Sequence, residues 1–265
     1  MTGVQTCALP ICGDLLRRLK ADGITQVVIG GGEPCEWPGD WRWAAQTAHR
    51  QGFLVQLGTN GAPLPEGFEC EQAVDRFVLP LDGASASIHN RLRPMAPLSK
   101  RWARQDPAWL DKPGPRSGHF AIIIDRLETL RRARREVTLS TVITAENIAE
   151  IPALAALVTQ YVAAGGCLHA WHLYRFIPEG RGGRAHQERL AVGAGAYDAA
   201  VALARRSAPE ISIYRRPDMR HSKTVDFYWY SRGALCIGSR IWEKQEEAAA
   251  SVSSPSGDRS SAASG

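Results

Sequence analysis

The sequence contains no run of about 18 consecutive apolar residues, so no membrane-spanning helix is expected. Cysteine is scarce, with six in 265 residues, and the six are scattered rather than grouped into a disulfide framework. That usage is typical of the reducing cytoplasm, where we expect this protein to reside. The apolar stretch at residues 7–12 is too short, and wrongly flanked, to be a signal peptide.

Lysine is also rare. Only five of the 32 basic residues are lysine, the other 27 are arginine, and the net charge is +5. A GC-rich genome would account for this bias. An anionic substrate would account for it as well, because arginine binds phosphate and carboxylate groups through paired hydrogen bonds. Charge of this size predicts little about the fold, and nucleic acid is not an expected partner.

Short apolar segments alternate with helical patterns along most of the chain. Strands are expected at residues 27–30, 53–57, 76–81, 137–143 and 169–177. Helices with one apolar face are expected at residues 13–23, 41–51, 120–135, 151–161 and 195–207. This alternation is typical of an α/β fold with a parallel sheet. Asn147 and Glu150 resemble a capping pair, and residues 211–214 are expected to pair with residues 225–230 as short closing strands.

Two segments differ from this alternating pattern. Residues 92–118 contain five prolines, so they cannot form a regular element. We interpret them as an insertion loop over the mouth of the fold, with a simple linker as the alternative. Residues 244–265 are rich in Ala, Ser, Gly and Glu and are expected to be a disordered tail. The folded domain is therefore expected within residues 12–243.

The most informative motif is Gly31-Gly32-Glu33-Pro34, directly after the first expected strand. Glycines let a backbone adopt positive φ and approach a ligand closely. Free carbonyls and one carboxylate at a strand end suit an ammonium group, and in parallel α/β barrels that end carries the active site. Later strands end in comparable short motifs: Thr-Asn-Gly at 59–61, Leu-Asp-Gly at 81–83 and Phe-Ile-Pro at 176–178.

In this order, and together with TVITAENIAEIPAL and WHLYRFIPEGRG, these segments resemble the radical S-adenosylmethionine (SAM) superfamily. The resemblance runs from about Gly13 to about Arg184. It implies an α/β fold, a partial (β/α)6 TIM-type barrel that is missing its first strand and its cluster loop. Within the superfamily, the segments look most similar to the viperin-like branch and to the cofactor maturases.

The resemblance also implies which residues bind SAM. In the family the GGEP stretch receives the methionyl amino group, and the later strand ends lie near the rest of the molecule. The implied cofactor-binding residues are Gly31, Gly32, Glu33, Pro34, Thr59, Asn60, Asp82, Thr141, Asn147, Phe176, Ile177 and Pro178. Arg181 and Arg184 are the candidates for binding an anionic substrate. Local alternatives remain, because Asn60-Gly61 is a good turn and Asp82 or Asn147 could cap a helix.

The family's C-x-x-x-C-x-x-C signature, which holds a [4Fe–4S] cluster through three thiolates, is absent. No three of the six cysteines have that spacing, so no metal ligand is assigned; they are Cys7, Cys12, Cys35, Cys70, Cys167 and Cys236. Residues 1–11 resemble a translated sequencing-library adapter, which predicts that they are an artefact and that the chain is truncated at its 5′ end. The alternative is the genuine N-terminus of a degenerate homologue.

The sequence therefore predicts part of a radical SAM enzyme that is inactive as it stands. By the resemblance, the intact form would use [4Fe–4S] and SAM to generate a 5′-deoxyadenosyl radical that abstracts hydrogen from a small-molecule or peptide substrate. A reductase or a flavodoxin-type protein would donate the electron. One alternative is a cluster-free homologue that binds SAM or a nucleotide. Another is an ordinary barrel hydrolase or isomerase, for which only Glu33 and Asp82 offer an acid/base pair.

Overall fold

The computed structural model describes residues 8–37, 39–95, 118–178, 180–219, 225, 228–231 and 234–237. The chain divides into two compact units, Met1–Pro217 and Asp218–Gly265, and each is described by itself. Most of the expected insertion at 92–118 and the whole expected tail at 244–265 lie outside the described residues. So do residues 1–7 of the expected artefact.

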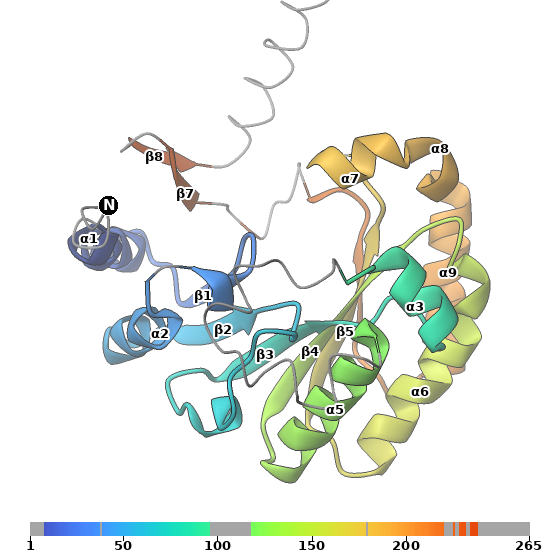
Figure 1. Ribbon diagram of the computed structural model, residues 1–265, viewed down its shortest axis with the longest axis horizontal. Coiled ribbons are helices and arrows are strands. Elements are labelled where there is room, and N and C mark those ends of the chain that lie inside the picture. Colours follow the sequence, from blue (N-terminus) through green and yellow to red (C-terminus); the bar gives the residue numbers. More distant parts are fainter. Residues whose placement is uncertain are drawn as a thin grey trace, which may run out of the picture. The chain divides into compact units, whose positions relative to one another are not determined.

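Six parallel strands form the sheet of the first unit, and their order in space follows their order in the sequence. The sheet curls into half of a barrel (Figure 1). Because every neighbouring pair is parallel, all the carboxyl ends meet at one rim. The predicted partial α/β barrel is confirmed. Its strands are β1 (Gln26–Ile29), β2 (Leu54–Gly58), β3 (Arg76–Pro80), β4 (Glu136–Ile143), β5 (Leu168–Arg175) and β6 (Ile213–Arg216).

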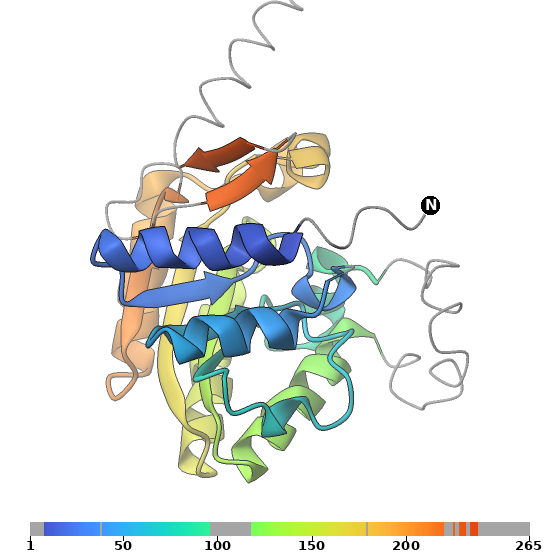
Figure 2. The same ribbon diagram turned by 90° about the vertical axis from the view of Figure 1, so that its left-hand side faces the viewer.

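The longer helices lie along the outer side of this sheet (Figures 1 and 2). They are α1 (Ala8–Ala21), α2 (Trp41–Arg50), α5 (His119–Arg132), α6 (Ile151–Ala163) and α9 (Ala194–Ser207). The shorter elements are α3 (Ala86–Leu92), α7 (Gly180–Ala185), α8 (Gln187–Leu190), η1 (Pro34–Glu36), η2 (Phe68–Cys70) and η5 (Ile148–Glu150). In the part of the chain that is described, none of the helices has the length and apolar character needed to cross a membrane.

Alternation along the strands shows where the core lies. In β2, Val55 and Leu57 are fully buried, whereas the residues between and beside them are half-buried. Val28 of β1 pairs in register with Gln56, on the opposite side of the sheet from this core, and it is 55% exposed. Tyr214 of β6 is 46% exposed. The apolar core thus lies between the sheet and its helices, and the concave side of the sheet is the more open one.

The expectation for the closing strands is wrong. Within the described residues, β6, which contains the end of the expected strand at residues 211–214, pairs with β5 and extends the main sheet. In the second unit, β7 (Tyr228–Ser231) pairs antiparallel with β8 (Ala234–Ile237). Each expected segment does contain a strand, but the sequence pattern did not reveal its partner.

The expected capping pair is also wrong. The Asn147 side chain makes no capping hydrogen bond to η5. The Glu150 carboxylate reaches across the rim, where it accepts from the Ala84 backbone nitrogen at 2.9 Å and from the Ser85 hydroxyl at 3.1 Å. Ser85 itself caps α3, since its hydroxyl accepts from the Ile88 backbone nitrogen. Glu150 therefore fixes the start of α3.

Gly83 lies where the chain passes from β3 towards α3. A Cβ atom at this position would lie 2.6 Å from the backbone nitrogen of His89 and 3.1 Å from Glu150 Oε2. Backbone atoms cannot swing aside as the end of a flexible side chain can, so only glycine fits. The absence of a side chain at Gly83 lets α3 lie directly over the end of β3.

Gly83→Ala is therefore expected to lower the free energy of unfolding by about 1–3 kcal/mol, the range for overpacked sites. Denaturant-induced unfolding measures it. Gly195→Ala is the matched control, because nothing lies within 4 Å of a Cβ at that position of α9. It should be neutral or stabilise the protein by up to about 1 kcal/mol, since alanine favours helices over glycine. Equal stabilities for the two variants would contradict the close approach at Gly83.

Candidate functional site

Glu33 ends the glycine-rich segment that follows β1. Its carboxylate accepts from the Cys35 backbone nitrogen at 3.3 Å and so caps η1. Pro34, which is buried, opens that short helix, a position that suits proline because no N–H has to be satisfied there. The local sequence thus holds the half-buried Glu33 carboxylate at the carboxyl rim of the sheet.

The turn after β2 contacts the same carboxylate. The Thr59 hydroxyl donates to Glu33 Oε1 at 2.6 Å, and the Asn60 backbone N–H donates to Oε2 at 2.6 Å. The Thr59 oxygen accepts from the Gly61 nitrogen at 3.0 Å, and the Asn60 side-chain oxygen accepts from the Ala62 nitrogen at 2.9 Å. The expected Asn-Gly turn is therefore present, and it directs two donors at Glu33.

The surroundings of Glu33 suit a cationic ligand. None of the ion pairs found in the described part of the chain includes Glu33. Gly31 and Gly32 have φ angles of 84° and 63°, and nothing lies within 4 Å of a Cβ placed on either. A carboxylate held by neutral donors beside open backbone fits an ammonium group, which would add a charge-assisted hydrogen bond.

Asp82, after β3, is held in a different way. Its Oδ1 accepts from the Val142 backbone nitrogen at 2.7 Å, and its Oδ2 pairs with Arg93 Nε at 2.5 Å. Its backbone oxygen accepts from Asn147 Nδ2 at 2.8 Å. Asp82 is only 3% exposed. The carboxylate joins the end of β3 to β4, and its charge is already balanced by Arg93.

Thr141 and Asn147 are fully buried and saturated by contacts within the protein. The Thr141 hydroxyl donates to the Leu81 carbonyl and accepts from Trp171 Nε1 at 2.8 Å. The Asn147 amide also donates to the Val142 carbonyl at 2.8 Å, and its oxygen accepts from the Thr144 nitrogen at 2.8 Å. Through these hydrogen bonds, the two side chains stabilise the rim next to Asp82.

Two buried histidines that sequence reasoning missed connect these strand ends. His89 of α3 accepts from the Asp82 backbone nitrogen through Nδ1 at 3.1 Å, and its Nε2 lies 2.7 Å from His119 Nδ1. His119 Nε2 lies 2.8 Å from the Asn60 carbonyl oxygen. Burial lowers the pKa of His89 to about 4 and is the main cause of a lowered pKa at His119. Both rings are therefore neutral at pH 7.

The segment after β5 lies further along the rim. The Phe176 nitrogen donates to the Ile143 carbonyl at 3.1 Å, and Ile177 and Pro178 lie against Gly183 of α7. All three of the expected residues in this segment are half-buried. The side chain of Arg181 lies outside the described part of the chain.

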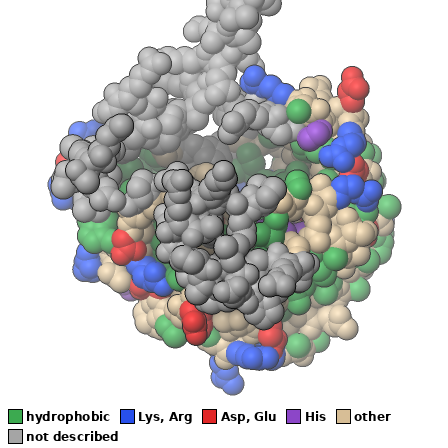
Figure 3. All heavy atoms as spheres, viewed as in Figure 1, with side chains coloured by type: hydrophobic (Ala, Val, Ile, Leu, Met, Phe, Trp, Pro, Cys, Tyr) green, Lys and Arg blue, Asp and Glu red, His purple; other side chains and the backbone are tan. Residues whose placement is uncertain are grey.

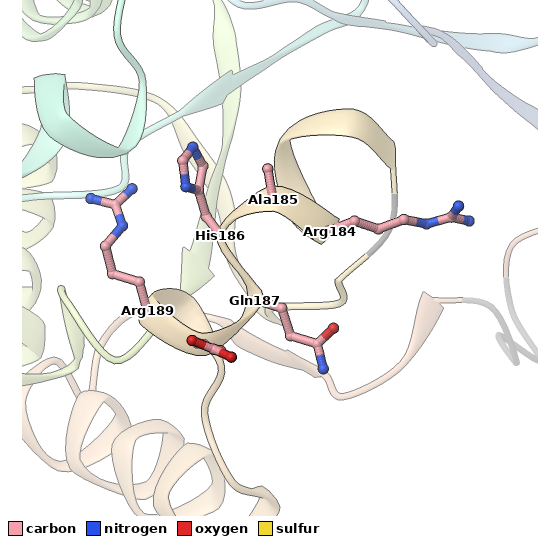
Figure 4. A pocket seen from close by; sticks show the side chains of 6 residues that line it. Arg184, Ala185, His186, Gln187 and Arg189 are labelled. Carbon is pink, nitrogen blue, oxygen red and sulfur yellow. The ribbon is translucent and has the colours of Figure 1, made fainter.

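An open pocket of about 520 Å³ lies at the turn between α7 and α8, lined by Arg184, His186 and Arg189 among others. Arg184 points away from Arg189, so the two guanidinium groups do not converge (Figure 4). Arg189 pairs with Glu146 at 2.8 Å, and Glu146 also pairs with Arg91 at 3.2 Å. Figure 3 likewise shows Lys and Arg spread around the periphery of one face, with carboxylates among them.

Within the described ranges, no group of three or more His, Cys, Asp or Glu side chains is placed to hold a metal ion. Cys35 directly follows the GGEP motif and is half-buried. Its burial, reinforced by the nearby Glu33 charge, raises the pKa of the thiol to about 12. A thiol that remains protonated is a poor nucleophile and a poor metal ligand.

No protein-family model matches the chain. It is 28% identical over 182 residues to the mycofactocin maturase MftC of Mycobacterium ulcerans, and 28% identical over 176 residues to MftC of Mycobacterium tuberculosis. The matches cover 67% and 64% of this chain, but 41% and 37% of those proteins. The chain thus spans about two fifths of the length of the curated relatives it matches.

Solved structures show the same fold. Streptococcus suis SuiB bound to S-adenosylmethionine superposes with a TM-score of 0.53 and 13% identity, over 80% of this chain and 42% of that one. A second structure of SuiB gives a TM-score of 0.54 and 14% identity, over 80% and 44%. The similarity in sequence to the mycofactocin maturases and the half-barrel shared with SuiB agree with the strand-end motifs, which resemble those of the radical SAM superfamily.

Proposed function

We propose that this chain is the SAM-binding part of a radical SAM enzyme, and that Glu33 receives the ammonium group of SAM. The observation that carries the proposal is the state of that carboxylate. Three neutral donors, from Cys35, Thr59 and Asn60, hold it at the rim. None of the ion pairs found within the described residues includes this carboxylate. An ammonium group beside Gly31 and Gly32 would balance its charge.

The other residues implied by the resemblance have separate parts in this proposal. Phe176, Ile177 and Pro178 would lie beside the adenine. Asp82, Thr141 and Asn147 would fix the rim between the two ends of the ligand, since their polar atoms already have partners. When bound, SAM supplies the adenosyl group that enzymes of this superfamily use for hydrogen abstraction.

The residues of this chain do not fit a [4Fe–4S] cluster. No three cysteines have the required spacing, and the described part contains no ligand group. We therefore derive no reaction step through a cluster, and we propose that the chain alone is inactive. The intact enzyme would carry its cluster cysteines on a segment before Gly13. The edge position of β1, which pairs only with β2 among the described strands, supports an additional strand there.

The absence of a cysteine triad equally favours the second candidate, a cluster-free homologue that binds SAM or a nucleotide. Sequencing the source DNA upstream of the Cys12 codon separates the two. A strand followed by C-x-x-x-C-x-x-C in frame would support the enzyme. A genuine start codon without those cysteines would support the cluster-free binder.

For the intact enzyme we propose a peptide substrate. SuiB has been crystallised bound to the precursor peptide SuiA, and the similarity to the mycofactocin maturases favours the cofactor-maturase branch over the viperin-like one. The open concave side of the sheet would face that substrate, with His172 and Tyr214 in edge-to-face contact at 5.2 Å between ring centroids. Arg181 and Arg184 stay candidates for an anionic group of the substrate.

Glu33→Gln is expected to weaken SAM binding by about 10–100-fold, because it removes a charge-assisted hydrogen bond. Isothermal titration calorimetry on the 265-residue chain measures the dissociation constant. Glu36→Gln is the matched control, because Glu36 is an exposed carboxylate in the same segment. This variant should bind SAM with the affinity of the wild type.

A second ligand makes this test specific. 5′-Methylthioadenosine lacks the amino group, so Glu33→Gln should leave its affinity nearly unchanged. An equal loss for both ligands would mean that Glu33 acts on the fold of the segment and not on the ammonium group. Failure of the wild type to bind SAM would contradict the proposed function itself.

Anaerobic reconstitution with iron and sulfide tests the absence of a cluster. The 265-residue chain should gain no stable brown [4Fe–4S] species, because it lacks three suitably spaced thiolates. The readout is visible absorption before and after the addition of SAM. A stable cluster whose spectrum changes with SAM would refute this prediction.

A further inference from the structure

The contact between His89 and His119 has backbone groups at both ends that fix its direction. The Asp82 nitrogen can only donate, so His89 Nδ1 accepts from it. The Asn60 carbonyl can only accept, so His119 Nε2 donates to it. Between them, His89 Nε2 and His119 Nδ1 are 2.7 Å apart. One arrangement satisfies all three contacts: each ring carries a single proton, on Nε2, and His89 donates to His119.

A second proton on either ring does not fit this arrangement. On His89 it would face the N–H of Asp82, and on His119 it would face the N–H of His89. The rings are nearly parallel, at 12°, and are 0% and 5% exposed. Asp82 and Arg93 act electrostatically on both rings with opposite sign, and they pair with each other. The lowered pKa of each histidine agrees with this geometry.

His89 and His119 thus form a relay of hydrogen bonds, and this relay ends on Asn60, the residue that contacts Glu33. The carbonyl of Asn60 accepts from His119, and the N–H of the same residue donates to Glu33 Oε2. Arg126 of α5 holds the next residue, because its Nε donates to the Gly61 carbonyl at 3.2 Å. The turn at residues 59–61 is thus fixed by α5 on one side and offers its donors to Glu33 on the other.

We propose that His89 and His119 are positioning residues. As a neutral relay with fixed tautomers, they hold the turn at residues 59–61, and through it Glu33, in the orientation that receives an ammonium group. The part of this inference that concerns the ligand rests on the proposed function. The relay itself belongs to the protein without ligand, and neither imidazole has to touch SAM.

The tautomers are measured directly by ¹⁵N NMR of the 265-residue chain labelled at histidine. Both rings should carry the proton on Nε2 at pH 7. Both should remain neutral at pH 5, where an ordinary histidine is mostly charged. A proton on Nδ1 of either ring at pH 7, or a charged ring there, would overturn the relay.

Substitution of His119 tests the positioning role. His119→Phe removes both hydrogen bonds of the ring, whereas His119→Gln keeps an amide donor for the Asn60 carbonyl. In His119→Phe we expect hydrogen exchange at the Asn60 amide to accelerate by about tenfold. The dissociation constant for SAM should also rise by about tenfold. His119→Gln should lie between that variant and the wild type. His49→Gln, at an exposed position on α2, is the control and should change neither value.

The outcomes separate this inference from the proposed function. If the wild type binds SAM and His119→Phe changes neither exchange at Asn60 nor affinity, the positioning role is wrong and the function stands. If the wild type does not bind SAM, the function is wrong. In that case unchanged exchange at Asn60 in His119→Phe rejects the relay, and accelerated exchange with partial rescue by His119→Gln supports it. If His119→Phe does not fold, the tautomers of the wild type and the His119→Gln variant decide.

Discussion

The carboxyl rim of the sheet depends on one requirement, that every buried polar group there has a partner. Parallel strands end together, and the backbone groups that are buried there need hydrogen-bond partners within the protein. Here a continuous series of hydrogen bonds meets the requirement from β1 to β4. It runs from Glu33 through Asn60, His119 and His89 to Asp82, and ends at Asn147. Loss of one member would leave its neighbours buried and unsatisfied, which is unfavourable in a medium of low dielectric constant.

This requirement explains the placement of the helices at the rim. The relay needs α3 close enough to the end of β3 for His89 to meet the Asp82 nitrogen, and Gly83 permits that approach. It also needs the start of α5 to lie close to the turn after β2, so that His119, the first residue of α5, can hydrogen-bond the Asn60 carbonyl. The Phe120 nitrogen is in turn held by Asn90 Oδ1 at 2.8 Å. Packing, backbone geometry and the candidate site are therefore parts of one arrangement.

The sequence predicted what depends on local pattern. The expected strands that make up the sheet agree with the observed strands to within about two residues, because apolar periodicity is local information. The GGEP segment was placed at a strand end for the same reason. The two histidines were missed because their roles arise from contacts between residues 30 and 59 positions apart. A partial signal for α3, the helix that carries His89, was available, because Ser85 is a good helix N-cap three residues after Asp82. The pairing of β6 could not be predicted either, because neither periodicity nor composition encodes which strand lies next to it.

Two carboxylates lie on the rim, Glu33 after β1 and Asp82 after β3, and their surroundings favour different roles. Asp82 is buried, and its charge is balanced by Arg93, so a further cation would have to displace a formed ion pair. Glu33 is half-buried and is held by neutral donors alone among the contacts described, so its negative charge still attracts a cation. Because neutral donors fix its position without cancelling its charge, Glu33 is oriented before a ligand arrives. A cationic group that binds there therefore meets a carboxylate that needs little rearrangement, which is the condition for favourable recognition of charge at a partly buried site.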